Sequence, residues 1–194
     1  DLTIKRAFPH VHPRKRETKI GTHTINVPYP HPGEYGENFA MGKKAVTLFG
    51  GSSRKILPSF GRAAEELGRA IAREGWTLRT GGGKGTSVMG RAADGALEAG
   101  GRVEGVILAR FHRARHDGLT SMRTVETYPR RKAGLLRNAS AVIAFPGGIG
   151  TMDEWFETLA MKQSGFLPLP IVLLNLEGFY DPLLAWLRES ERKK

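Results

Sequence analysis

From Lys44 onward, short apolar runs alternate with segments whose apolar residues have helical spacing, and most of the runs end in glycine. Short apolar runs bounded by turn residues are typical of buried strands. Strand and helix in repeated alternation predict a mostly parallel sheet with helices on both faces. We therefore expect an α/β fold with a doubly wound sheet.

The same pattern predicts where each strand and helix begins and ends. A proline at the first helical position and a glycine after the last one are ordinary helix boundaries, as at Pro58 and Gly75. Residues 110–118 are expected to form a polar loop. Strands are predicted at 45–49, 76–79, 103–108, 121–127, 141–145 and 171–174. Helices are predicted at 58–74, 87–99, 129–138, from 151 onward, and at 181–190.

Residues 1–43 differ from the rest of the chain. They contain five prolines and four of the six histidines and have no sustained period, which predicts an irregular arm. The histidines have no metal-site spacing, so we expect no metal there. Residues 44–194 are long enough for one domain with its own core.

Composition restricts where such a chain functions. There is no cysteine, no apolar run near the roughly 20 residues that span a bilayer, and no charged-then-apolar secretory signal. We expect a cytoplasmic protein without membrane contact.

Three glycine-rich turns follow predicted strands, at 50–53, 81–85 and 146–151. The carboxyl ends of parallel strands share one edge of the sheet, so the turns are expected to meet in one crevice. Four hydroxyl side chains accompany them: Ser52, Ser53, Thr86 and Thr151. The crevice is predicted to bind an anionic ligand the size of a nucleotide. The turns match neither a dinucleotide fingerprint nor a Walker loop, which disfavours ATP-driven chemistry.

The turn that begins at Pro146 is the most informative of the three. It lies between a buried strand and the helix expected from Thr151, where backbone N–H groups and the helix dipole attract anions. Glu154 is expected in the first turn of that helix. Two interpretations of this carboxylate stay open: it only complements the helix dipole, or it does chemistry on a phosphorylated sugar.

The stretch Pro146-Gly147-Gly148-x-Gly150-Thr151-x-x-Glu154 resembles the signature of the Lonely Guy (LOG) family, once misnamed lysine decarboxylases. Further similarities are Gly51-Ser52-Ser53, the triple glycine at 81–83, and Arg131-Lys132 at the family's offset before Glu154. The resemblance covers roughly residues 44–190. It departs at residues 83–88, where the loop is one residue longer than usual, and in an unusually basic segment at 110–120.

The resemblance implies a Rossmann-like catalytic domain in a homodimer or higher homo-oligomer, without a cofactor or metal. The implied reaction is hydrolysis of a nucleoside 5′-monophosphate, AMP or a cytokinin riboside 5′-monophosphate, to free base and ribose 5-phosphate. The implied catalytic pair is Arg131 and Glu154. The implied phosphate-binding residues are Gly147, Gly148, Ile149, Gly150 and Thr151. The implied substrate-binding residues are Ser52, Ser53, Gly82, Gly83, Met89, Lys132 and Asp153.

Two other functions remain open. Molybdenum-cofactor carrier proteins share much of the loop, so the chain is alternatively a carrier of a phosphorylated ligand without turnover. The net charge of +11 and eight Arg or Lys residues between Arg110 and Arg137 raise single-stranded nucleic-acid binding as a third hypothesis. The basic segment is interleaved with few aromatic residues, which argues against nucleic acid.

Overall fold

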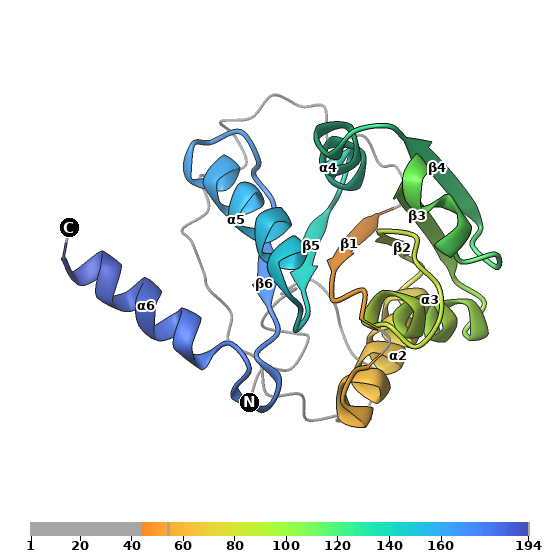
Figure 1. The fold of residues 1–194 in the computed structure, drawn as a ribbon, viewed down its shortest axis with the longest axis horizontal. Helices are drawn as coiled ribbons and strands as arrows, with labels where there is room; N and C mark the ends of the chain where they lie inside the picture. The colour runs from red at the N-terminus through yellow and green to blue at the C-terminus, as the bar shows by residue number, and fades with distance from the viewer. Residues whose placement is uncertain (1–43, 54, 194) are drawn as a thin grey trace.

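The computed structural model describes residues 44–53 and 55–193, and the predicted arm at 1–43 lies outside them. The described strands form one sheet of six, all parallel, in the order β4-β3-β2-β1-β5-β6 (Figure 1). Their bounds are β1 Ala45–Phe49, β2 Thr77–Thr80, β3 Arg102–Leu108, β4 Ser121–Val125, β5 Ala141–Ala144 and β6 Ile171–Leu173. The predicted α/β fold with a parallel, Rossmann-like sheet is confirmed.

The strand order contains a reversal between β1 and β5. The chain moves outward from β1 through β2 and β3 to the edge strand β4, and then returns to pair β5 with the other side of β1. The pair is in register from Val46 opposite Ala141 to Phe49 opposite Ala144. Ligands of doubly wound sheets bind at such a switch point, outside the carboxyl ends of the strands.

Helices cover both faces of the sheet (Figure 1). On one face α2 (Pro58–Arg73) and α3 (Val88–Glu98) pack on each other and on a core that includes Leu48 and Leu78. On the other face α4 (Tyr128–Leu136), α5 (Ile149–Gln163) and α6 (Asp181–Arg192) cover a second core. Strand residues alternate between the two cores, as the period of two requires.

The element boundaries agree with the sequence prediction to within about two residues, and two differences concern the loop at 110–118 and the start of α5. Residues 110–118 are not wholly irregular, because Ala109–Ala114 forms the 3₁₀ turn η2. Helix α5 begins at Ile149, two residues before the predicted start. Gly148 is extended, with φ −88° and ψ −156°, and the chain becomes helical directly after it. The second difference moves Glu154 out of the first helical turn.

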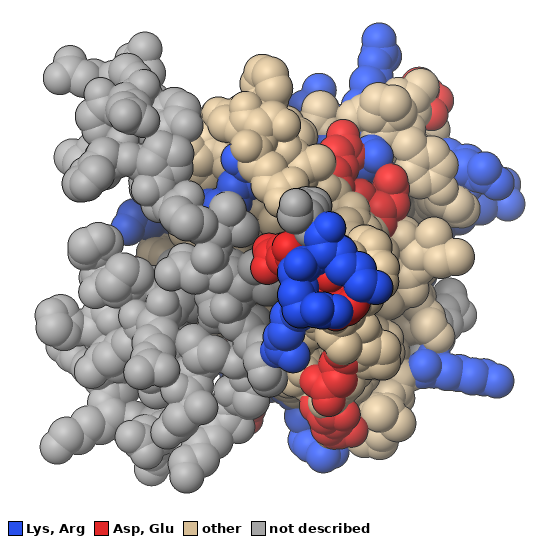
Figure 2. All heavy atoms as spheres, turned by 90° about the vertical axis from the view of Figure 1, so that its left-hand side faces the viewer, with Lys and Arg blue, Asp and Glu red and all other residues tan. Residues whose placement is uncertain are grey.

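The described residues contain no helix long and apolar enough to cross a membrane. They also contain no group of three or more His, Asp or Glu side chains arranged as a metal site. Figure 2 shows basic and acidic side chains next to one another on the face that lies on the α6 side of the molecule. The positive charge of the chain is therefore not concentrated on the described part of that face.

Candidate active site

The site begins at the amino end of α5, where the chain leaves the central strand β5. Gly148 occupies the N-cap position, and within the described part of the chain no side chain caps the helix there. The first helical hydrogen bond runs from the Met152 N–H to the Gly148 carbonyl, at 3.1 Å. The N–H groups of Ile149, Gly150 and Thr151 precede it and have no acceptor within the helix. These groups and the helix dipole form a place for an anion.

Two of the three glycine turns are packed directly on each other at this point. A Cβ placed on Gly147 would overlap Oγ1 of Thr151 and lie 2.9 Å from the Gly51 nitrogen. The turn after β1 and the turn after β5 therefore meet without side chains between them. By contrast, a Cβ on Gly148 or Gly150 would meet no atom of the described residues within 4 Å. The loop is packed on its inner side and open on its outer side, where a ligand would lie.

The predicted catalytic residues are brought together from two helices. Nη1 of Arg131, on α4, donates a hydrogen bond to Oε1 of Glu154, on α5. Both side chains are largely buried, with 15% of the Arg131 side chain and 9% of the Glu154 side chain exposed. A buried carboxylate requires such a partner, because an unpaired charge in this position would be strongly unfavourable.

Two further contacts hold the Arg131 side chain in place. Its Nε donates to the Val106 carbonyl of β3, at 3.2 Å. Its Nη2 lies against Gly81, where a Cβ would overlap it. Met89 completes the contact, with its sulfur 2.9 Å from the same Cβ position. Met89 was expected among the substrate-binding residues, and the structure places it under the turn after β2, 8% exposed.

Burial dominates the electrostatics of Glu154. Desolvation raises the pKa of its carboxyl group above the ordinary value of 4.5, and the nearby Arg131 charge opposes this shift. The expectation that Glu154 lies in the first turn of α5 is wrong, because no acidic residue is found in that turn. Glu154 lies in the second turn and faces α4. Dipole complementation therefore does not account for its position.

Lys132 and Asp153 form a second link between the two helices. Nζ of Lys132 lies 3.2 Å from Oδ1 of Asp153 and 2.5 Å from Oε2 of Glu157. Hydrogen bonding to Glu157 and Asp153 raises the pKa of Lys132. Lys132 and Asp153, both predicted to bind substrate, are thus bonded to each other and each follows or precedes a member of the predicted catalytic pair in the chain.

The triple-glycine turn is joined to the basic segment by backbone contacts. Gly82 has φ +76°, its N–H donates to Oγ1 of Thr80 at 3.1 Å, and its carbonyl accepts from His116 N–H at 2.8 Å. Gly83 forms an isolated bridge with Arg115. Ser52 and Ser53 lie exposed in the turn after β1. Over residues 44–53 and 55–193, no hydrogen bond joins either serine to Arg131 or Glu154.

Sequence reasoning missed the group that anchors α4. Arg79 of β2 is 8% exposed, donates from Nη1 to the Arg137 carbonyl at 2.6 Å, and pairs with Glu104 at 2.8 Å. It also reaches the Leu135 carbonyl at 3.3 Å, which accepts in addition from Oγ1 of Thr47 at 2.6 Å. The arginine therefore binds the carboxyl end of the helix that carries Arg131. The signal available in the sequence was a charged residue within the strand predicted at 76–79.

Comparison with known proteins gives consistent matches. A family model described as possible lysine decarboxylase matches residues 89–194. The cytokinin riboside 5′-monophosphate phosphoribohydrolase of Rhodococcoides fascians is 40% identical over 150 residues, which are 76% of this chain and 75% of that protein. A probable cytokinin riboside 5′-monophosphate phosphoribohydrolase of Oryza sativa subsp. japonica is 37% identical, over 72% of this chain and 63% of that protein. The chain thus spans less than two thirds of the plant relative's length.

Solved structures add a second kind of relative. The molybdenum cofactor carrier protein from Chlamydomonas reinhardtii is similar with a TM-score of 0.61 and 27% sequence identity, over 77% of this chain and 87% of that chain. The likeness supports the arrangement of sheet and helices described above.

Proposed function

Since the chain belongs to the LOG family, whose model still carries the description possible lysine decarboxylase, we propose that it hydrolyses nucleoside 5′-monophosphates. The observation that carries this proposal is the buried Arg131–Glu154 pair beside the uncapped amino end of α5. AMP and cytokinin riboside 5′-monophosphate are the proposed substrates, because the curated relatives are named for the latter.

The open loop supports a role in holding the 5′-phosphate. In the proposed complex the N–H groups of Ile149, Gly150 and Thr151 donate to phosphate oxygens, and Gly147 and Gly148 let the backbone approach closely. The phosphate then fixes the ribose beside the second turn of α5. Glu154 is on that turn, so its carboxylate is within reach of the sugar rather than of the phosphate.

The proposed chemistry is cleavage of the bond between ribose C1′ and the base nitrogen. As this bond breaks, positive charge builds up on the ribose, as in glycoside hydrolysis. The Glu154 carboxylate stabilises that charge and orients a water molecule toward C1′. The water oxygen bonds to C1′, one of its protons goes to the departing base, and ribose 5-phosphate and free base are released. Arg131 keeps the carboxylate ionised and in position.

Incubation of the protein with AMP and with a cytokinin riboside 5′-monophosphate tests the proposal, with free base and ribose 5-phosphate measured separately. Both products are expected in equal amounts, and Glu154→Ala is expected to abolish their release. Glu98→Ala is a matched control, because it breaks another interhelical arginine–glutamate pair, with Arg69 at 2.7 Å. If Glu154→Ala still releases base from AMP, the proposed catalytic role of Glu154 is wrong.

The likeness to the molybdenum cofactor carrier favours one competing function, which is binding of a phosphorylated ligand without turnover. Measuring pterin binding and base release from AMP on the same preparation distinguishes the two functions. A carrier would bind a molybdopterin-type ligand and release no base from AMP. Base release without pterin binding would exclude the carrier.

We also propose a homodimer and a cytoplasmic location, as the family resemblance and composition imply. Phe156 of α5 and Trp186 of α6 are 38% and 58% exposed and lie edge to face, with ring centroids 6.4 Å apart. Exposed aromatic pairs of this kind are common in subunit contacts. Light scattering is expected to give twice the monomer mass, and a monomer at micromolar concentration would contradict the assembly. Cell fractionation tests the location.

A further inference from the structure

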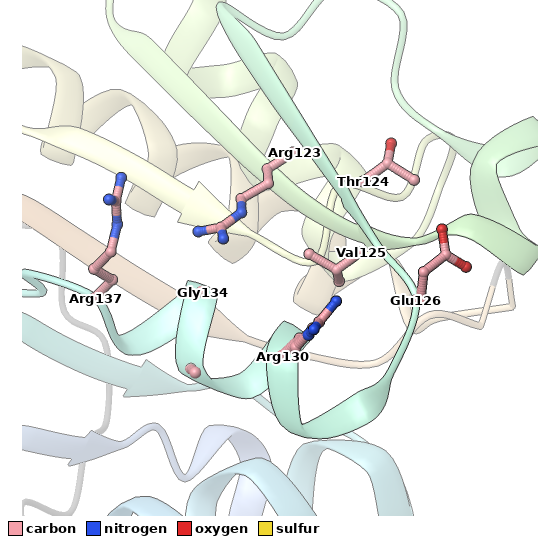
Figure 3. Close-up of a pocket in the computed structure, with 8 residues that line it drawn as sticks. Arg123, Thr124, Val125, Glu126, Arg130, Gly134 and Arg137 are labelled. Carbon is pink, nitrogen blue, oxygen red and sulfur yellow. The ribbon is translucent and has the colours of Figure 1, made fainter.

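A groove lies between the edge strand β4 and helix α4, on the side of α4 away from the catalytic pair. It encloses about 410 Å³. An adjoining cavity of about 170 Å³ shares Arg123, Gly134 and Arg137 with it. Figure 3 shows Arg123 extending from β4, Arg130 and Gly134 on α4, and Arg137 directly after the end of this helix. The spacing of the α4 residues, three and four positions apart, puts them on one face of the helix.

The groove is strongly basic. Its lining contains three guanidinium groups, those of Arg123, Arg130 and Arg137, and one carboxylate, that of Glu126. Within residues 44–53 and 55–193, no ion pair joins any of these three arginines to a carboxylate. In the adjoining cavity Glu104 is already paired with Arg79 at 2.8 Å. The excess positive charge in the groove therefore has no partner in the described chain.

Gly134 shapes the floor between the arginines. A Cβ at this position would lie 3.0 Å from Cγ1 of Val106 and 3.9 Å from Nη1 of Arg123. The bare glycine thus lets α4 approach β3 closely, beside the Arg123 guanidinium. The guanidinium groups of Arg123, Arg130 and Arg137 line one groove, so a single ligand with several negative charges can contact more than one of them.

We propose that this groove binds a small ligand that carries at least two negative charges on phosphate, such as a phosphate monoester or a diphosphate. Its volume matches ligand sites in size, at roughly 300–1,000 Å³. None of the described residues that line it is aromatic, so they offer no stacking surface of the kind that single-stranded nucleic acid uses. This site is separate from the proposed 5′-phosphate position, because α4 presents Arg131 and Lys132 to α5 and presents Arg130 and Arg137 to β4.

Calorimetric titration of the full chain with inorganic pyrophosphate at low salt tests the proposal. The double variant Arg123→Ser/Arg137→Ser is expected to bind pyrophosphate about tenfold or more weakly, because each lost guanidinium removes charge-assisted hydrogen bonds. The control Arg62→Ser/Arg188→Ser removes two exposed arginines from α2 and α6 and is expected to bind like the wild type. Phosphate held at the amino end of α5 would be unaffected by either double variant.

Arg130→Glu is a second variant that keeps the fold. Position 130 is in the first turn of α4, where an acidic residue favours the helix, so weaker pyrophosphate binding there is not a consequence of unfolding. Displacement of pyrophosphate by ribose 5-phosphate would show that the groove accepts a sugar phosphate as its ligand. Equal pyrophosphate affinity in the wild type and in Arg123→Ser/Arg137→Ser would contradict the proposal that this groove binds the ligand. Binding of a thymidine 20-mer that pyrophosphate does not displace, and that Arg130→Glu abolishes, would overturn the assigned ligand class.

Discussion

Arg131 and Glu154 belong to different helices and meet beside the switch point of the sheet, where the Arg131 guanidinium is bonded both to the Glu154 carboxylate and to the Val106 carbonyl of β3. The pair therefore depends on the relative placement of α4, α5 and the sheet. Glycine turns border this arrangement closely enough that single methyl groups are expected to disturb it.

Gly81→Ala is expected to inactivate the enzyme without unfolding it. The added methyl group would overlap Nη2 of Arg131 and lie 2.9 Å from the Met89 sulfur, so the guanidinium would have to move. A misplacement of this size costs on the order of 100-fold in kcat. Gly61→Ala in α2 is the control, because its Cβ would meet Ile56 at an ordinary 3.6 Å. The measurement is base release from AMP together with thermal unfolding, and full activity in Gly81→Ala would contradict the proposed role of Arg131.

Arg131→Lys is expected to impair catalysis although it keeps the positive charge. A lysine has one nitrogen in place of three and cannot contact Glu154 and the Val106 carbonyl with the geometry of a guanidinium. We expect kcat for AMP to fall by about 100-fold or more, with a smaller change in KM. The exposed Arg73→Lys in α2 serves as the control. A change confined to KM would instead indicate that Arg131 only binds substrate.

The acidic side of the pH profile of catalysis is expected to reflect the raised pKa of Glu154. The proposed reaction uses the carboxylate, so activity is lost as the pH falls through the pKa of this group. Burial raises that pKa above 4.5, and the acidic limb of kcat/KM is therefore expected at a higher pH than an exposed glutamate would give. Rates measured from about pH 4 to 8 check this. An acidic limb at or below 4.5 would show that the carboxyl group is not the one that limits activity.

The sequence was sufficient for the sheet and for singling out Arg131 and Glu154, which the structure pairs, but not for the geometry around them. Strand and helix periods are local, so β1, β5 and the helices between them were predictable from apolar spacing. The start of α5 was not, because Ile149 and Gly150 are poor signals for a first helical turn and only the extended Gly148 sets the boundary. The contacts of Arg131 with Gly81 and Val106 join segments far apart in the chain, and no local pattern reports them.

Arg79→Met is expected to destabilise the fold and to loosen the helix that carries Arg131. The substitution removes donors to the Leu135 and Arg137 carbonyls and leaves Glu104 without its partner. Breaking a largely buried pair of this kind costs about 3 kcal/mol of unfolding free energy. Arg102→Met, at the exposed beginning of β3, is the control and should change the unfolding free energy by less than about 0.5 kcal/mol. Urea unfolding measures both, and equal stability of the two variants would mean that Arg79 does not anchor α4.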